Sequence, residues 1–238
     1  MIRVAAVGDV HVGTDSAGCL RPRYEHLGDM ADVLLVAGDL TRRGELEEAK
    51  VLANELDGLP VPVICVLGNH DYHSGVEDDV VKVLNDAGVM VLEGDATVVE
   101  TAGGERLGVA GVKGFGGGFP GRCGSEFGEP EMKAFMAHSR EVADRLCHAL
   151  DSLDTDRRVA LTHYAPVEAT LRGEPLEIYP FLGSYLLAEA IDAAGADLAI
   201  HGHAHRGSEK GVTPGGVHVR NAAEPVLKQA YAVYCLDA

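Results

Sequence analysis

Hydrophobic residues gather in short runs along the chain, and these runs lead into Asp, Asn or His. Their length and β-branched content are typical of buried strands, and they cover residues 2–7, 33–37, 61–67, 159–161 and 198–200. Apolar residues at helical spacing predict helices over residues 45–56, 78–87, 129–150 and 184–194. Strands that alternate with helices favour an α/β fold.

The pattern changes between residues 89 and 112, where apolar stretches lie on both sides of Gly103-Gly104. This spacing predicts consecutive strands with a hairpin, and therefore a second sheet. The Gly-rich residues 114–128 show no apolar period and predict a loop that could shape a substrate pocket. Because no linker or repeat interrupts the chain, we expect residues 1–238 to form a single domain.

Composition limits the classes of partner. The 238 residues are 46% hydrophobic and 24% charged, which are ordinary values for a globular protein. The formal net charge is -17, from 37 acidic and 20 basic residues, and such a surface repels phosphate backbones. Long nucleic acid is therefore not an expected partner, whereas bound cations would suit the acidic balance.

Cysteine usage and hydropathy indicate the compartment. Five scattered cysteines without CxxC spacing form neither a disulfide framework nor a zinc ribbon, so we expect reduced thiols. The N-terminal residues lack the pattern of a signal peptide, and no apolar run approaches the roughly 18 residues of a membrane span. We therefore expect a cytoplasmic protein that is not embedded in a membrane.

Polar residues follow the predicted strands in five places. In open α/β sheets the loops beyond the carboxyl ends of strands converge on one edge, so these residues can meet in space. Each segment is weak by itself, since a lone His is more often structural, but the set in its order is specific. The segments are Asp9-Val10-His11, Gly38-Asp39, Gly68-Asn69-His70-Asp71, Thr162-His163-Tyr164 and Gly202-His203-Ala204-His205.

A mixture of carboxylates and imidazoles predicts the type of metal. These ligands suit Mn, Fe, Zn, Co or Ni, whereas an all-oxygen set would indicate Mg or Ca. A carboxylate can bridge two ions about 3.5–4 Å apart, which share a hydroxide and hold the oxygens of the attacked group. Phosphoester hydrolysis is the chemistry to which such a pair is suited.

The five segments resemble the motifs DxH, GDxxxxG, GNHD or GNHE, a His-containing block and GHxH of the calcineurin-like metallophosphoesterase superfamily. They extend from Asp9 to His205, which is most of the chain. The resemblance implies an α/β fold, a four-layer α/β/β/α sandwich of two mixed sheets flanked by helices. It also implies two divalent or trivalent metal ions held by seven ligands. One ion would be bound by Asp9, His11 and His205, the other by Asn69, His163 and His203, and Asp39 would bridge both.

The same resemblance assigns catalytic and substrate-binding roles. His70 would contact the phosphate beside Asn69 and protonate the leaving oxygen, and Asp71 would orient His70. The nucleophile would be a metal-bridged hydroxide. Arg43 is a further candidate, since a guanidinium there could hold a phosphate, although a solvated helix start explains it equally well. His73 and Tyr164 are candidates for lining the pocket, and Asn221 for supporting it.

The expected activity is hydrolysis of a small-molecule phosphodiester, such as a cyclic nucleotide, or of a phosphomonoester. The ligands do not decide between these substrates, and the oligomeric state stays open. One alternative is a nuclease of the same superfamily, which the acidic charge disfavours. The other is a non-catalytic metal-binding scaffold, which should have lost ligands. Asp71 and the segment Thr41-Arg42-Arg43 depart from the pattern expected of protein Ser/Thr phosphatases.

Overall fold

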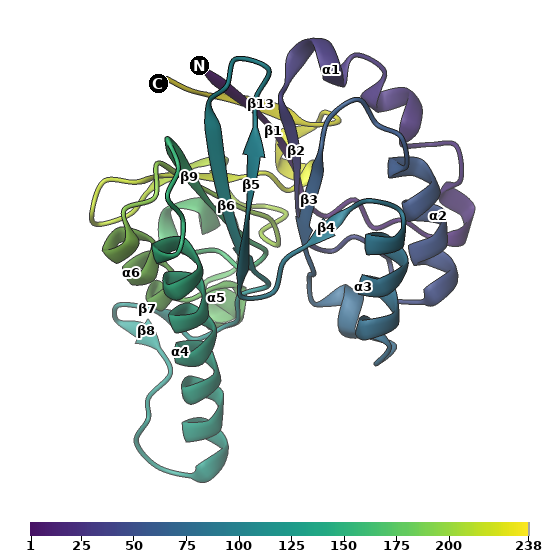
Figure 1. Ribbon diagram of the computed structural model, residues 1–238. Helices are drawn as coiled ribbons and strands as arrows, with labels where there is room; N and C mark the ends of the chain where they lie inside the picture. Colours follow the sequence, from purple (N-terminus) through teal and green to yellow (C-terminus); the bar gives the residue numbers. More distant parts are fainter. Residues whose placement is uncertain (238) are drawn as a thin grey trace.

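Two sheets lie face to face between two layers of helices (Figure 1). The computed structural model describes residues 1–237. Helices α1 (Leu27–Met30), α2 (Leu46–Leu56) and α3 (Glu77–Asp86) cover the outer face of one sheet, and α4 (Pro130–Asp151) and α6 (Tyr185–Ala194) cover that of the other. This arrangement confirms the four-layer α/β/β/α sandwich expected from the sequence.

The first sheet has the strand order β13-β1-β2-β3-β4. Strands β1 (Ile2–Val7), β2 (Val33–Ala37), β3 (Val63–Val66) and β4 (Met90–Val91) are parallel, and β13 (Ala232–Leu236) pairs antiparallel with β1. Strand β3 begins two residues later than predicted, since Pro62 has no amide hydrogen to donate to the ladder. The sequence pattern did not predict β13.

The second sheet has the order β11-β12-β10-β9-β6-β5. Strands β6 (Arg106–Val112), β9 (Arg157–Thr162), β10 (Leu198–His201) and β12 (His218–Asn221) are parallel, while β5 (Asp95–Glu100) and β11 (Lys210–Val212) are antiparallel edges. The predicted hairpin is β5–β6. Strand β4 pairs with β3 of the first sheet, so residues 89–112 contribute strands to both sheets.

The core has three apolar layers because both faces of each sheet are buried. Side chains alternate along a strand, so one row faces the opposite sheet and the next row faces the helices. Leu35 of β2 and Leu161 of β9 lie in the layer between the sheets. Leu34 and Ala160 point outward into the helix-facing layers. This double burial explains why the strands read as continuous apolar runs.

Short elements complete the described chain. The Gly-rich stretch predicted as a loop contains the hairpin of β7 (Gly118–Phe119) and β8 (Arg122–Cys123), which lies with the N-terminal half of α4 beyond the sheets in Figure 1. Helices α5 (Tyr179–Leu182) and α7 (Glu224–Leu227) each make one turn. Short 3-10 turns cover Thr14–Ser16, Arg21–Tyr24, His70–Tyr72, Glu168–Leu171 and Leu176–Ile178. Within residues 1–237, no helix has the length and apolar character needed to cross a bilayer.

Truncation of a side chain between the sheets should be costly. Leu35 is fully buried, so Leu35→Ala leaves a cavity and should lower the free energy of unfolding by about 2–5 kcal/mol. Val98→Ala, on the edge strand β5 where the side chain is exposed, should change it by less than about 1 kcal/mol. Denaturant unfolding of both variants measures the difference, and equal losses would contradict the layered core.

Candidate metal centre

All seven predicted ligands lie where the ends of the parallel strands of both sheets meet. Strand β1 leads to Asp9 and His11, β2 to Asp39, and β3 to Asn69. The second sheet supplies the remaining residues, since β9 leads to His163 and β10 to His203 and His205. The facing of the two sheets therefore brings together segments that are up to 196 residues apart, as in the contact between Asp9 and His205.

The ligand atoms form two clusters that share one carboxylate. Within each cluster the atoms lie within 4.8 Å of one another. Asn69 belongs beside the second cluster, because its Oδ1 lies 3.0 Å from Nε2 of His163. The two clusters divide the candidate ligands as the family motifs implied. Their coordination of two metal ions stays a prediction. The clusters are Asp9, His11, Asp39 and His205, and Asp39, His163 and His203.

Backbone conformations at the centre are strained. A positive φ is uncommon for residues other than glycine and clusters at functional sites. Within residues 1–237 five such residues occur, and four are predicted ligands. Backbone hydrogen bonds hold them in place, since the N–H of Asp9 donates to Gly38 and the N–H of His11 to Asp39. The residues are Asp9 (φ 59°), His11 (φ 43°), Asp39 (φ 48°), His203 (φ 69°) and, away from the centre, Lys228 (φ 53°).

Two motif glycines are required by close packing against the carboxylates. A Cβ at Gly68 would overlap the backbone nitrogen and Oδ1 of Asp39, and one at Gly202 would overlap Oδ2 of Asp9. Backbone approaches this close are open only to glycine. The first glycine of GNHD and that of GHxH therefore determine where the two carboxylates lie.

Burial and pairing set the protonation of the ligands. Burial raises the pKa of Asp9 to about 6, although the hydrogen bond from His205 opposes this shift. That same bond, 2.9 Å between Nε2 and Oδ1, raises the pKa of His205. Burial lowers the pKa of both His163 and His203 to about 3. These two imidazoles are therefore neutral near pH 7, the form that binds metals.

The donor set fits a pair of borderline metal ions. Asp9 and Asp39 are 3% and 2% exposed, and within residues 1–237 no ion pair joins them to an Arg or Lys; the nitrogens 2.9–3.9 Å from their oxygens belong to histidines. Buried carboxylates without a permanently charged partner are unfavourable unless they bind metal. Imidazole nitrogens complete a mixed nitrogen and oxygen set of the kind that Mn, Fe, Co, Ni and Zn prefer.

His70 lies at the edge of both clusters. Its Nδ1 is 2.8 Å from the carbonyl oxygen of Arg42, and since a carbonyl only accepts, Nδ1 donates in this bond. Its Nε2 is 3.9 Å from Oδ2 of Asp39, and the ring is 4.6 Å from that of His11. Nε2 is therefore the ring atom directed toward the metal centre.

Among residues 1–237 no hydrogen bond joins Asp71 to the His70 ring, although the family resemblance implied that Asp71 orients His70. One carboxylate oxygen accepts hydrogen bonds from the backbone N–H and the hydroxyl of Thr41 at 2.8 and 2.5 Å. The other accepts the backbone N–H groups of Leu40 and Gly68 at 3.1 and 2.7 Å. Asp71 therefore ties the loop after β2 to the loop after β3, and the Arg42 carbonyl is what orients His70.

The two arginines after Asp39, Arg42 and Arg43, make different contacts. Arg43 is exposed, and among residues 1–237 no hydrogen bond or ion pair joins its guanidinium to the centre; its contacts are made by the backbone, to Glu48 and Ser74. The Arg42 guanidinium pairs with Asp15 at 2.9 Å. It also lies against Gly13, two residues after His11. The substrate-binding role expected of Arg43 has no structural support beyond proximity in sequence.

Neighbouring residues support the centre. The Tyr164 ring lies 4.4 Å from the His203 ring, while His73 is exposed. The buried Asn221 donates to the carbonyl of Ala204 at 2.8 Å and so holds the segment between His203 and His205. Sequence reasoning missed Lys113, whose carbonyl accepts the N–H of His163 at 2.9 Å. Its position directly after a strand was the available signal.

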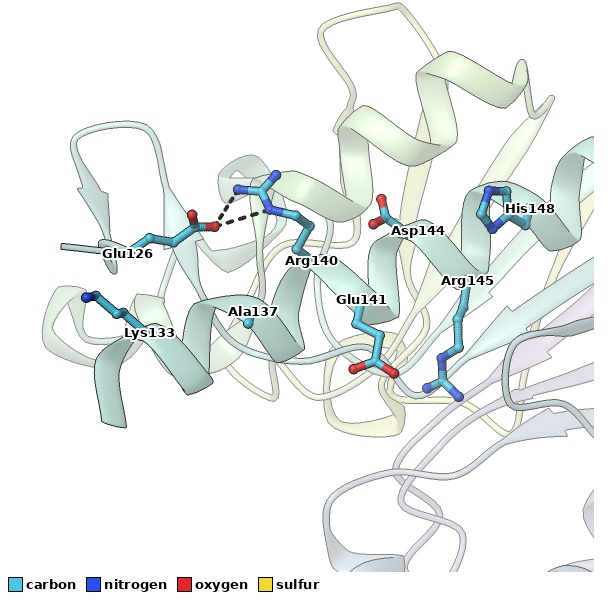
Figure 2. Close-up of a pocket in the computed structure, with 8 residues that line it drawn as sticks. All are labelled: Glu126, Lys133, Ala137, Arg140, Glu141, Asp144, Arg145 and His148. Atoms are coloured by element: carbon cyan, nitrogen blue, oxygen red, sulfur yellow. Dashed lines mark hydrogen bonds and ion pairs between the residues drawn. The ribbon is translucent and has the colours of Figure 1, made fainter. Parts of the chain in front are cut away.

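A large surface groove lies away from these clusters. Its volume is about 670 Å³, and it follows the outer face of α4 (Figure 2). Charged side chains line most of it, including Arg140, which pairs with Glu126. None of the predicted ligands lines this groove, so it is separate from the candidate metal centre.

Comparison with known proteins supports the family. The sequence profile of the calcineurin-like phosphoesterase family matches residues 2–207. The chain therefore belongs to the calcineurin-like phosphoesterase family, as the five motifs indicated. None of the curated proteins matches it significantly.

Solved structures of low sequence identity share the fold. Phosphopantetheinyl hydrolase from Mycobacterium tuberculosis is similar with a TM-score of 0.71 at 17% identity, over 98% of this chain and 96% of that one. The protein TT1561 of Thermus thermophilus has a TM-score of 0.62 at 17% identity, over 98% of each chain. An anchor protein of the Plasmodium inner membrane complex has a TM-score of 0.53 at 13% identity, over 94% of this chain and 72% of that one.

Metal binding at this centre should depend on pH. Above about pH 6, Asp9 is a carboxylate and His163 and His203 are neutral, so the proton that still competes with an ion is that of His205, whose pKa is raised. Below pH 6, protonation of Asp9 should weaken binding by up to about tenfold per pH unit. Calorimetric titration with Mn²⁺ between about pH 5 and 7.5, in buffers of different ionisation enthalpy, measures affinity and released protons. A flat affinity profile would contradict the assigned protonation.

Proposed function

We propose that this protein is a dinuclear metal-dependent phosphoesterase acting on a small-molecule phosphodiester, such as a cyclic nucleotide, or on a phosphomonoester. The supporting observation is that six motif residues form two clusters that share Asp39, with Asn69 and His70 beside them. Asp9, His11 and His205 would hold one ion, and Asn69, His163 and His203 the other. We further propose that the whole chain works as one metallophosphoesterase domain.

The chain's own groups would perform the remaining steps. Two bound ions would supply an activated water and neutralise charge on the phosphoryl oxygens. Asn69 and His70, neighbours at the end of β3, would contact the phosphoryl group. Nδ1–H of His70 stays on the Arg42 carbonyl, so the doubly protonated ring would deliver the proton of Nε2 to the leaving oxygen and be left neutral. Asp71 would keep His70 in place indirectly, by fixing the loops on both sides.

Two alternatives are less well supported. A nuclease would need a basic surface, whereas the net charge here is -17. The Plasmodium anchor protein has a similar fold, but a likeness at 13% identity concerns the fold alone and does not favour a non-catalytic scaffold here. A metal-binding scaffold would also leave His70 without a role.

Removal of the shared carboxylate should abolish hydrolysis. Metal-stripped protein reconstituted with Mn, Co, Ni or Zn should cleave bis(p-nitrophenyl) phosphate or p-nitrophenyl phosphate. Asp39→Asn should lose about a thousandfold or more in kcat/KM, whereas Asp78→Asn, an exposed carboxylate on α3, should retain activity. Preference between the two substrates decides between diester and monoester. Inactivity of the folded, metal-loaded protein on both would count against an enzyme.

Loss of the proposed proton donor should depend on the leaving group. His70→Ala should lower kcat by about 10²–10⁴-fold for an alkyl phosphate, whose leaving alkoxide needs a proton. The loss should be smaller for p-nitrophenyl phosphate, since nitrophenolate leaves without one. His73→Ala, which removes an exposed histidine of the same segment, is the matched control. Equal losses of kcat on both substrates would show that His70 is not the general acid.

A further inference from the structure

A lysine ammonium lies among three aromatic rings beside the candidate metal centre. Nζ of Lys113 is 4.7 Å from the ring centroid of Tyr72, 5.3 Å from that of Phe115 and 5.5 Å from that of Tyr164. Tyr72 follows His70-Asp71, Phe115 belongs to the Gly-rich stretch, and Tyr164 follows His163. Cation–π contacts of this kind hold an ammonium in position.

The direction of Lys113 follows from the alternation along β6. A Cβ at Gly111 would meet Val66 and Leu92, which belong to the apolar layer between the sheets, and Lys113 continues this row. Its carbonyl accepts the N–H groups of His163 and Tyr164 at 2.9 and 3.0 Å. Lys113 therefore stands beside His163 and extends between the ends of the two sheets, where it reaches Tyr72 on the opposite side.

The ammonium has no carboxylate partner among residues 1–237. Glu93, which with Asp39 is one of two acids whose charge acts on Lys113, pairs with Arg145 at 2.9 Å and accepts the backbone N–H of Lys113 at 3.0 Å. No ion pair of the described chain includes Lys113, although acidic residues outnumber basic ones by 37 to 20. A half-buried cation without an anionic partner is unfavourable. Such a group is available to an anionic ligand.

The rings place this ammonium beside the centre and not within it. The Tyr164 ring lies 4.4 Å from the His203 ring and also faces Phe115, at 6.0 Å between centroids. The Tyr164 ring is thus a common neighbour of the Lys113 ammonium and of the His203 ring. A group bound to Lys113 would be a neighbour of the phosphoryl group at the metal centre.

We propose that Lys113, enclosed by Tyr72, Phe115 and Tyr164, binds a second anionic group of the substrate. This inference rests on the proposed function and narrows its substrate class to phosphoesters that carry a further phosphate or carboxylate near the scissile bond. The rings reduce solvation of the ammonium, which strengthens its hydrogen bond to an anion. Loss of such a bond should weaken binding by about tenfold.

Binding of non-hydrolysable ligands tests the subsite without turnover. Propylene bisphosphonate and propylphosphonate differ by one phosphonate, and calorimetry on Mn-loaded protein gives both dissociation constants. Wild-type protein should bind the bisphosphonate about tenfold more tightly than propylphosphonate. The ratio of the two dissociation constants should fall to about one in Lys113→Met. Lys113→Arg, which keeps the charge, should retain the preference, as should Lys210→Met, which removes an exposed lysine of the edge strand β11.

The outcomes separate this inference from the proposed function. An unchanged ratio of the two dissociation constants in Lys113→Met would overturn the subsite. If both ligands bound more weakly by the same factor, the subsite would also be overturned, since Lys113 would contact the transferred phosphoryl group instead. A ligand with a carboxylate in place of the second phosphonate tells the two anions apart. Absence of hydrolysis together with an intact, Lys113-dependent ratio would refute the enzyme and leave the subsite standing.

Discussion

The buried carboxylate of Asp39 is the constraint on which the rest of this structure depends. It accepts the backbone N–H of His70 at 2.9 Å, and its oxygens lie 3.3 Å from Nε2 of His163 and 3.7 Å from Nε2 of His11. One carboxylate thus meets residues from three strand ends in two sheets. That is feasible only because the sheets pack face to face with their parallel strands ending at the same edge.

The stability of the surrounding fold offsets several unfavourable features of the centre. Left-handed backbone at Asp9, His11 and Asp39 costs free energy, as do buried carboxylates that no Arg or Lys pairs with in the described chain. The apolar layer between the sheets holds the strand ends at fixed distances, and the four hydrogen bonds to Asp71 join the loops after β2 and β3. The centre is therefore preorganised by contacts that take no part in chemistry.

The candidate metal ligands and the groups beside them come from different parts of the chain. The motif segments at the strand ends provide the candidate metal ligands, whereas Lys113, Phe115 and the Gly-rich stretch after β6 form a wall beside them. Structures of similar fold at 13–17% identity include a hydrolase and an anchor protein, so the fold alone does not select a function. The groups beside the centre are where a substrate would be distinguished.

The sequence by itself determined the central strands, the four longer helices, the family and the set of residues at the centre. Apolar runs buried on both faces and polar residues at their ends are local signals, and five motifs in order are specific. Tertiary structure decided the rest. Strand β13 forms by pairing with β1, and Asp71 accepts hydrogen bonds from the loops after β2 and β3 and none from the His70 ring. The Arg43 side chain is exposed, while Lys113 reaches Tyr72. The partner of a long side chain or of an edge strand lies in a segment distant in sequence. Such a contact stabilises the protein only when packing brings both groups together, so the local sequence does not determine it.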